Sequence, residues 1–268
     1  MEGWLLLGGG SVYIVKGDEE PLPRVYAVPR LLGGVKLHVD PRELCSYTEC
    51  VEDPCLEGCL APVVDPRRYR VVSPFEAAEG LSGGTRLEDA ARELLSVFLR
   101  EGFIAGVTGS LAYAPHLARD IDVVVYGLHE EAYELLRELR SSGLTSNPWE
   151  PWRLTEGLYR GVPYSIRLMR AASPRRCLRR RVAARGVCVE GVVVYSDAHA
   201  TPSIYILDAD GLEVVVATYR MRYSELPVGV RVRVCGVIEE HGGRTMLVPD
   251  REGVLEPLDI VYELGQVP

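Results

Sequence analysis

The residues best suited to chemistry are Gly109 and Ser110, followed ten residues after the serine by Asp120-Ile121-Asp122. Side chains alternate faces along a β-strand, so Asp120 and Asp122 are expected to present two carboxylates to one space. Mg²⁺ prefers carboxylate oxygens and commonly bridges to substrate phosphates. Gly109 permits close approach to a triphosphate, Ser110 supplies a hydroxyl, and the first amides of a following short helix favour an anion. The pattern predicts a metal-dependent site for phosphate chemistry.

The surrounding stretch, IAGVTGSLAYAPHLARDIDVVVYG, resembles the signature of the polymerase-beta-type nucleotidyltransferase superfamily. The resemblance implies that Asp120 and Asp122 bind Mg²⁺ and act in catalysis. It also implies that Gly109 and Ser110 position an NTP whose NMP group is transferred to a hydroxyl or phosphate. The alternative is that Asp-x-Asp stands alone, since such pairs also occur in loops and calcium sites.

A third carboxylate, which this superfamily usually adds from a neighbouring strand to complete a two-metal site, is missing from the matching segment. Residues 161–169 read GVPYSIRLM and contain no acid. Ser165 and Arg167 are expected on the face where the acid would lie, and Glu150 and Glu156 fall in a loop-like stretch nearby. Arg167 is expected to neutralise a bound phosphate, because a guanidinium is planar and always charged.

Composition limits the class of protein. With 268 residues and 47% hydrophobic residues, two or three packed domains are expected. No apolar run approaches the roughly 18 residues of a membrane span, and the first residues lack a signal peptide's basic region, so a soluble, cytoplasmic protein is expected. The net charge of −8 argues against a general polycation, and Lys16 and Lys36 are the only lysines among thirty basic residues.

Four consecutive segments are expected, with an α/β (α+β) fold overall. Residues 1–84 form a β-rich domain with short strands at 11–16, 24–28, 36–39 and 69–72. Residues 85–172 form a minimal nucleotidyltransferase core, which opens with a helix capped by Thr85 and Glu88. Residues 173–186 form a basic linker helix. Residues 187–268 form an OB-like β-barrel.

The core segment is expected to contain strands at 104–108, 120–126 and near Tyr164, with a helix at about 129–140. The barrel segment is expected to have five strands, at 187–195, 203–208, 212–219, 230–239 and 244–248. Barrels of this kind bind single-stranded nucleic acid through a charged groove and stacking aromatics. Such a surface is expected from four tyrosines and four arginines, unless the tyrosines serve packing alone: Tyr195, Tyr205, Tyr219, Tyr223, Arg220, Arg222, Arg231 and Arg233.

The densest cluster of basic residues lies between core and barrel, where residues 167–185 hold eight arginines and no acid. Ser173 and Pro174 are typical of a helix start. Four arginines would then share a face that suits RNA or DNA: Arg175, Arg176, Arg179 and Arg180. The alternative is a solvated helix paired with acidic residues elsewhere in the chain.

Four of the seven cysteines are crowded into fifteen residues: Cys45, Cys50, Cys55 and Cys59. Two alternatives stay open for them, local disulfides and a structural zinc site, because the spacing departs from paired C-x2-C motifs. Cys177, Cys188 and Cys235 are expected to be small core residues.

Further segments are similar to a family of archaeal proteins described as predicted nucleotidyltransferases: VYIVKGDEEPLPRVYAVPR, YRVVSP, YRGVPYSIRLM, TPSIY and VRVCGVIEE. This similarity implies the architecture and an NTP/Mg²⁺ site, without a substrate. Two hypotheses follow. The first is an Mg²⁺-dependent nucleotidyltransferase acting on a nucleic-acid or small acceptor. The second is a nucleotide- or nucleic-acid-binding protein that has lost catalysis with its third carboxylate.

Overall fold

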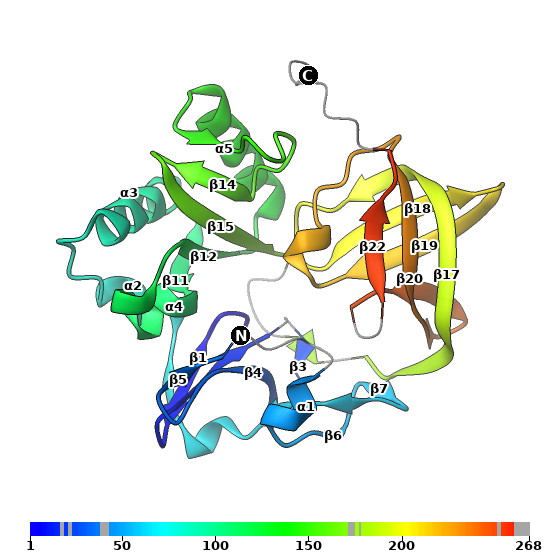
Figure 1. Cartoon of the computed structure of the whole chain (residues 1–268), viewed down its shortest axis with the longest axis horizontal. Helices are drawn as coiled ribbons and strands as arrows, with labels where there is room; N and C mark the ends of the chain where they lie inside the picture. The colour runs from blue at the N-terminus through cyan, green and yellow to red at the C-terminus, as the bar shows by residue number, and fades with distance from the viewer. Residues whose placement is uncertain are drawn as a thin grey trace. The chain divides into compact units, whose positions relative to one another are not determined.

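The computed structural model describes residues 1–16, 19–20, 23–37, 43–170, 175–176, 178–250 and 253–259. These residues form a mixed α+β structure rich in strands (Figure 1). The chain divides into two compact units. The first comprises Met1–Val51, Leu60–Pro148 and Leu154–Cys177, and the second comprises Glu52–Cys59, Trp149–Arg153 and Leu178–Pro268. The domain boundary expected at residue 84 therefore lies inside the first unit, because residues on both sides of it pack together.

The first unit contains an antiparallel sheet with strand order β10-β1-β2-β4-β5. The strands expected at 11–16, 24–28 and 69–72 are confirmed. The end of the strand expected at 36–39 lies outside the described residues. The strands are β1 (Leu5–Gly8), β2 (Ser11–Val15), β4 (Val25–Leu32), β5 (Val35–Lys36) and β10 (Arg70–Val72), with β9 (Val63–Val64) also pairing with β4.

A second sheet in the same unit has the order β11-β12-β15-β14-β13. Strand β12 runs antiparallel to β11 and parallel to β15. The strands are β11 (Ile104–Thr108), β12 (Ile121–Tyr126), β13 (Thr145–Ser146), β14 (Glu156–Tyr159) and β15 (Val162–Met169). The three strands expected here from the sequence are confirmed as β11, β12 and β15.

Helices α3 (Arg86–Arg100) and α5 (His129–Ser141) pack against this sheet and confirm the two expected helices. Thr85 caps α3 by accepting a hydrogen bond from the amide of Glu88, which is half of the expected capping box. A complete capping box begins α2 (Pro74–Glu79), where Ser73 and Glu76 exchange hydrogen bonds. The alternating residues Ile121, Val123 and Val125 of β12 are buried, which leaves Asp122 on the opposite face.

The second unit is built around a closed five-stranded barrel, in which β17-β18-β19-β21-β20 is completed by pairing of β20 with β17 (Figure 1). Strands β19 and β21 are parallel, and the other neighbours are antiparallel. The strands are β17 (Arg180–Asp197), β18 (Ser203–Ala209), β19 (Leu212–Thr218), β20 (Arg231–His241) and β21 (Arg244–Val248). All five expected barrel strands are present, and β22 (Val254–Pro257) adds a further pairing to β20.

The remaining elements are short. They are α1 (Leu44–Tyr47), α4 (Gly109–Tyr113), the 3-10 turns at Pro66–Arg68, Pro115–Leu117 and Met221–Tyr223, and strands β3 (Glu19–Glu20), β6 (Val51–Glu52), β7 (Leu56–Glu57), β8 (Leu60–Ala61) and β16 (Arg175–Arg176). Among the described residues, no helix is long and apolar enough to cross a membrane.

The cysteines favour disulfides over a zinc site. Cys45 is bonded to Cys50, and Cys55 is also disulfide-bonded, whereas Cys59 is a free, buried thiol. The four crowded cysteines therefore do not offer four thiolates to one zinc ion. The prediction that Cys188 and Cys235 are simple core residues is wrong. They are direct partners on β17 and β20 and form a disulfide. Cys177 lies outside the described residues.

The barrel disulfide is expected to stabilise the protein. Replacing Cys188 and Cys235 together with serine should lower the free energy of unfolding by about 2–4 kcal/mol, because a link across 47 residues constrains the unfolded chain. Urea titration followed by circular dichroism measures this. The Cys45→Ser/Cys50→Ser variant is the control, since its link spans only five residues and should have a smaller effect. Equal losses in the two variants would contradict the expectation.

Candidate acidic and basic site

The acidic pair lies where β11 ends and β12 begins. Thr108, the last residue of β11, is the direct partner of Asp122 on β12. Gly109 follows with a positive φ of 64° and begins α4, which leads through a 3-10 turn back to β12. A Cβ atom at Gly109 would overlap the Asp122 carboxylate. The structure therefore explains why glycine stands here: this carboxylate occupies the space that any side chain would fill.

Ser110, the second residue of the Gly-Ser pair, is buried in α4. Helix α4 is a single turn of five residues, and it packs beside both β11 and β12. The Gly-Ser pair and the acidic pair are thus brought together as expected from their spacing.

Asp120 and Asp122 lie two residues apart where β12 begins, and the charge of Asp120 acts on Asp122. Burial and, to a smaller extent, the neighbouring charge of Asp120 together raise the pKa of Asp122 to about 6, although three cations act in the opposite direction. The cations are Lys16, Arg30 and Arg167. Two neighbouring carboxylates, one of them shielded from water, favour a bound cation, because each disfavours the ionised form of the other. The residues present therefore fit a divalent metal ion.

The three cations come from distant parts of the sequence. Lys16 follows β2, Arg30 lies on β4 and Arg167 lies on β15. Lys16 and Arg167 both contact one carboxylate oxygen of Glu2, with N–O distances of 3.1 Å and 3.4 Å. Burial lowers the pKa of Lys16 from its usual value, although Glu2 opposes this effect.

Sequence reasoning found Arg167 but missed Lys16, Arg30 and Glu2, because they lie in the segment expected to be a separate β-rich domain. One signal was present, since Lys16 is one of only two lysines in an arginine-rich chain.

The place of the third carboxylate is taken by Ser165, the direct partner of Asp122 on the parallel strand β15. Arg167 follows on the same face, beside Val124. Glu156 on β14 pairs with Ser165, so Asp122, Ser165 and Glu156 form a row across three strands. Adjacent strands lie about 4.8 Å apart, which places the Glu156 backbone roughly 10 Å from that of Asp122. Glu150 belongs to the other unit, where it pairs with Arg153 at 2.8 Å.

The helix expected at 173–186 is wrong at 175–176, which form strand β16, and over 180–186, where the chain is the first part of β17. Pairing of β17 with β20 along the barrel overrides the local helix signals at Ser173 and Pro174, which themselves lie outside the described residues. Arg175 and Arg176 make up strand β16, for which the structure describes the backbone but not the side chains.

Three described arginines of this segment are paired with acids of the second unit. Arg179 contacts Glu57 at 3.8 Å and Arg180 contacts Glu239 at 3.2 Å. Arg181 contacts Glu240 at 2.7 Å. The alternative in which these arginines pair with acidic residues is therefore the observed one, but on a strand.

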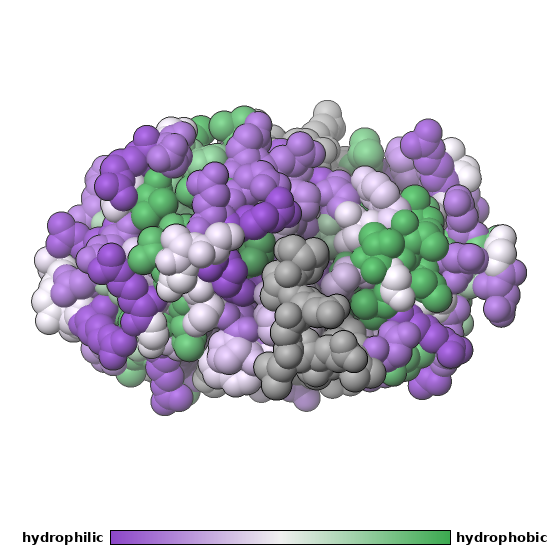
Figure 2. Space-filling view, turned by 90° about the horizontal axis from the view of Figure 1, so that it is seen from above, coloured by the Kyte–Doolittle hydropathy of each residue, from purple (hydrophilic) through white to green (hydrophobic). Residues whose placement is uncertain are grey.

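Two of the four barrel tyrosines are not available for the expected aromatic surface. Tyr205 is buried in the barrel core and its hydroxyl donates to the carbonyl of Tyr223, which is also buried. Tyr195 is exposed and lies in one row with Ile206 and Val215, across β17, β18 and β19. Figure 2 shows hydrophobic side chains gathered on the barrel surface. Arg231 and Arg233 both pair with Glu190. The outer face is thus more apolar and less basic than expected.

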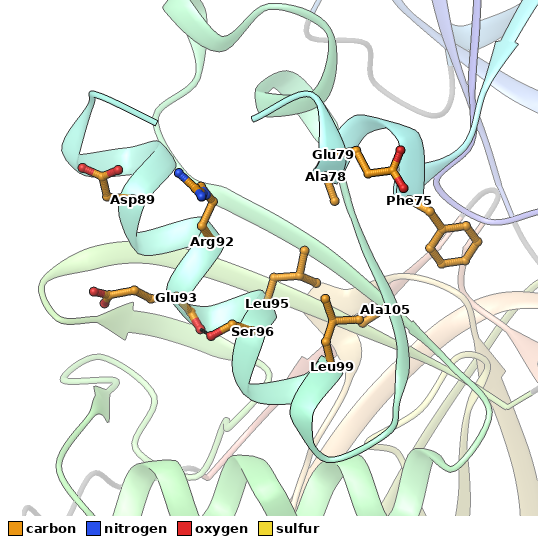
Figure 3. Close-up of a pocket in the computed structure, with 10 residues that line it drawn as sticks. All are labelled: Phe75, Ala78, Glu79, Asp89, Arg92, Glu93, Leu95, Ser96, Leu99 and Ala105. Atoms are coloured by element: carbon orange, nitrogen blue, oxygen red, sulfur yellow. Dashed lines mark hydrogen bonds between the residues drawn. The ribbon is translucent and has the colours of Figure 1, made fainter. Parts of the chain in front are cut away.

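A separate groove of the first unit is lined by α2, α3 and the start of β11 (Figure 3). Its volume is about 790 Å³, its centre is apolar, and its rim carries Glu79, Asp89, Arg92 and Glu93. None of the residues of the acidic pair or the three cations lines it.

Asp122→Asn is expected to stabilise the protein at pH 7.5. A folded-state pKa raised from 3.8 to about 6 gives a contribution that is favourable below pH 4 and is lost as the pH rises through 6. Removing the charge should therefore add up to about 3 kcal/mol to the free energy of unfolding at pH 7.5 and little at pH 4. Urea denaturation at both pH values measures this, and a gain that is equal at both would contradict the assignment.

Gly109→Ala is expected to displace Asp122. The positive φ alone costs about 1–2 kcal/mol for alanine, and the new methyl group would also overlap the carboxylate. Gly102→Ala is the matched control, because Gly102 also has a positive φ but nothing lies within 4 Å of the added atom. Thermal unfolding should show a larger loss for Gly109→Ala, and equal losses would show that Asp122 does not require glycine here.

Comparisons with known proteins identify no family. No protein-family model matches the chain, and no curated protein matches it. Among solved structures, it matches the "Crystal structure of S. pombe Stn1-ten1 complex" at 16% identity, over 39% of this chain and 65% of that chain, with a TM-score of 0.25. The match thus spans less than two thirds of that chain, and a TM-score of this size does not establish a shared fold.

Proposed function

We propose that the protein binds a nucleoside triphosphate with Mg²⁺ and transfers its NMP group to an acceptor, with release of pyrophosphate. The observation that carries this proposal is the Asp122 carboxylate held against Gly109, with Asp120 and three cations around it. Opposite charges arranged in this way suit a ligand that is itself a metal ion bound to phosphates. The order β11, α4, β12 and parallel β15 supports the proposed nucleotidyltransferase core.

Each residue has a proposed part. Asp120 and Asp122 would hold Mg²⁺, which when bound would neutralise phosphate charge and polarise the reacting phosphoryl group. Gly109 leaves room for the backbone to approach the phosphates, and Arg167 offers a fixed positive charge on the same face of the sheet. Glu156, in one row with Asp122 and Ser165, is the acid that would accept the proton of the attacking hydroxyl.

The second candidate function is nucleic-acid binding by a protein without catalysis. The closed barrel with its parallel β19–β21 pair favours this alternative, because five-stranded barrels of the OB type bind oligonucleotides on their outer strands. Pairing of Arg231 and Arg233 with Glu190 weakens it, since this carboxylate offsets one of their two positive charges.

The direct test is transfer of label from α-labelled NTPs, with Mg²⁺, to a pool of RNA, DNA and small hydroxyl acceptors. Incorporation by the intact protein is expected, with a loss of at least a thousandfold in the Asp120→Asn/Asp122→Asn variant. Asp65→Asn is the control, because this acid forms its own pair with Arg67 at 2.8 Å. Retained nucleic-acid binding without incorporation from any NTP would overturn the enzyme proposal in favour of the binding protein.

A further inference from the structure

The N-terminal sheet contributes two cations to the side of the acidic pair. We propose that Lys16 and Arg30, together with Arg167, form the subsite for the phosphate tail of the nucleoside triphosphate. This inference rests on the proposed function. Two of these residues, Lys16 and Arg30, lie at least ninety positions from Asp120 in the sequence.

The segment carrying Glu2 fixes the first sheet against the second. The hydroxyl of Thr108 donates to the carbonyl of Gly3 at 2.7 Å, and the hydroxyl of Tyr126 donates to the carbonyl of Glu2 at 2.5 Å. The amide of Gly3 donates to the carbonyl of Val15, the residue before Lys16. Backbone contacts to β11, β12 and β2 therefore place the Glu2 carboxylate independently of any charge.

Glu2 in turn brings two cations together. Its side chain is almost fully buried, and one oxygen contacts both Lys16 and Arg167. Lys16 keeps a third of its side chain exposed, so its ammonium can reach a ligand. A phosphate would share these cations with Glu2, because an ammonium has three donors and a guanidinium has five.

Arg30 reaches the site through a β-bulge. Tyr13 pairs with Pro29 and Val12 pairs with Leu31, which leaves Arg30 as the extra residue of β4. A bulge re-aims the side chain of the inserted residue. Leu31, the next residue of β4, packs in the same hydrophobic cluster as Tyr113 of α4, which brings this part of β4 to the helix that follows the Gly-Ser turn. The charge of Arg30 acts on both Asp122 and Tyr113. Among the described residues, its guanidinium forms no hydrogen bond or ion pair.

The balance of charges identifies the class of ligand. Three cations face three carboxylates, those of Glu2, Asp120 and Asp122, so the protein groups alone are close to neutral. A divalent metal ion bound by the aspartates leaves an excess of positive charge. A chain of phosphates bearing several negative charges matches that excess, whereas a single carboxylate ligand would not.

The scarcity of lysine permits a sharp test without catalysis. Lys16 and Lys36 are the two lysines, and Lys36 contacts the carbonyl of Leu117 outside the acidic pair. The intact protein is acetylated with limiting reagent, with and without inorganic tripolyphosphate and Mg²⁺, and the two sites are quantified by mass spectrometry. Acetylation of Lys16 is expected to fall at least fivefold while that of Lys36 is unchanged. Equal protection of both, or of neither, would overturn the subsite.

Variants complete the test. Lys16→Met and Arg30→Met are each expected to weaken tripolyphosphate binding by about tenfold in calorimetry, and Lys36→Met should have no effect. Thermal unfolding identifies any variant that fails to fold. The acetylation experiment uses the intact protein and needs no variant. Loss of NTP transfer in Asp120→Asn/Asp122→Asn but not in Lys16→Met or Arg30→Met would overturn this inference alone. Tripolyphosphate protection of Lys16 without any NTP transfer would instead overturn the proposed function and retain the anion subsite.

Discussion

The partial burial of the Asp122 carboxylate is the constraint around which the first unit is organised. A buried charge must be neutralised by a proton, a metal ion or nearby cations. The neighbouring charge of Asp120 disfavours the ionised form of Asp122, whereas Lys16, Arg30 and Arg167 favour it. Because Arg30 and Arg167 lie on strands of different sheets and Lys16 directly follows β2, both sheets must be in place before the carboxylate is compensated.

Glycine at position 109 belongs to the same constraint. Its lack of a side chain lets the carboxylate lie against the turn between β11 and α4, and its positive φ allows the turn to form. The ten-residue spacing between Ser110 and Asp120 is the length of chain needed to pass through α4 and the 3-10 turn back to β12. A sequence pattern and a packing requirement are therefore two descriptions of one local structure.

Local patterns predicted most of the strands and the approach of Gly109 to Asp122, because alternation, turn residues and helix caps act over a few positions. They could not predict that Lys16 and Arg30 lie beside residues far along the chain, since nothing local records that contact. Local patterns also gave the wrong prediction where tertiary contacts outweighed the local preference. Residues 180–186 became a strand because β20 offers both backbone hydrogen bonds and the acids Glu239 and Glu240. Tyr205 became a core residue because its hydroxyl found a carbonyl inside the barrel.

The second unit includes two short pieces of chain that interrupt the first unit in sequence, and this has a consequence for how the gene could be rearranged. Residues Glu52–Cys59 and Trp149–Arg153 belong with the barrel although their neighbours belong to the first unit. The first piece supplies β7, the partner of β17, and the second supplies Arg153, which donates to the carbonyl of Arg222. A break between residues 177 and 178 would sever the barrel from both. A recombination event at that point would transfer the five barrel strands without β7 and without Arg153.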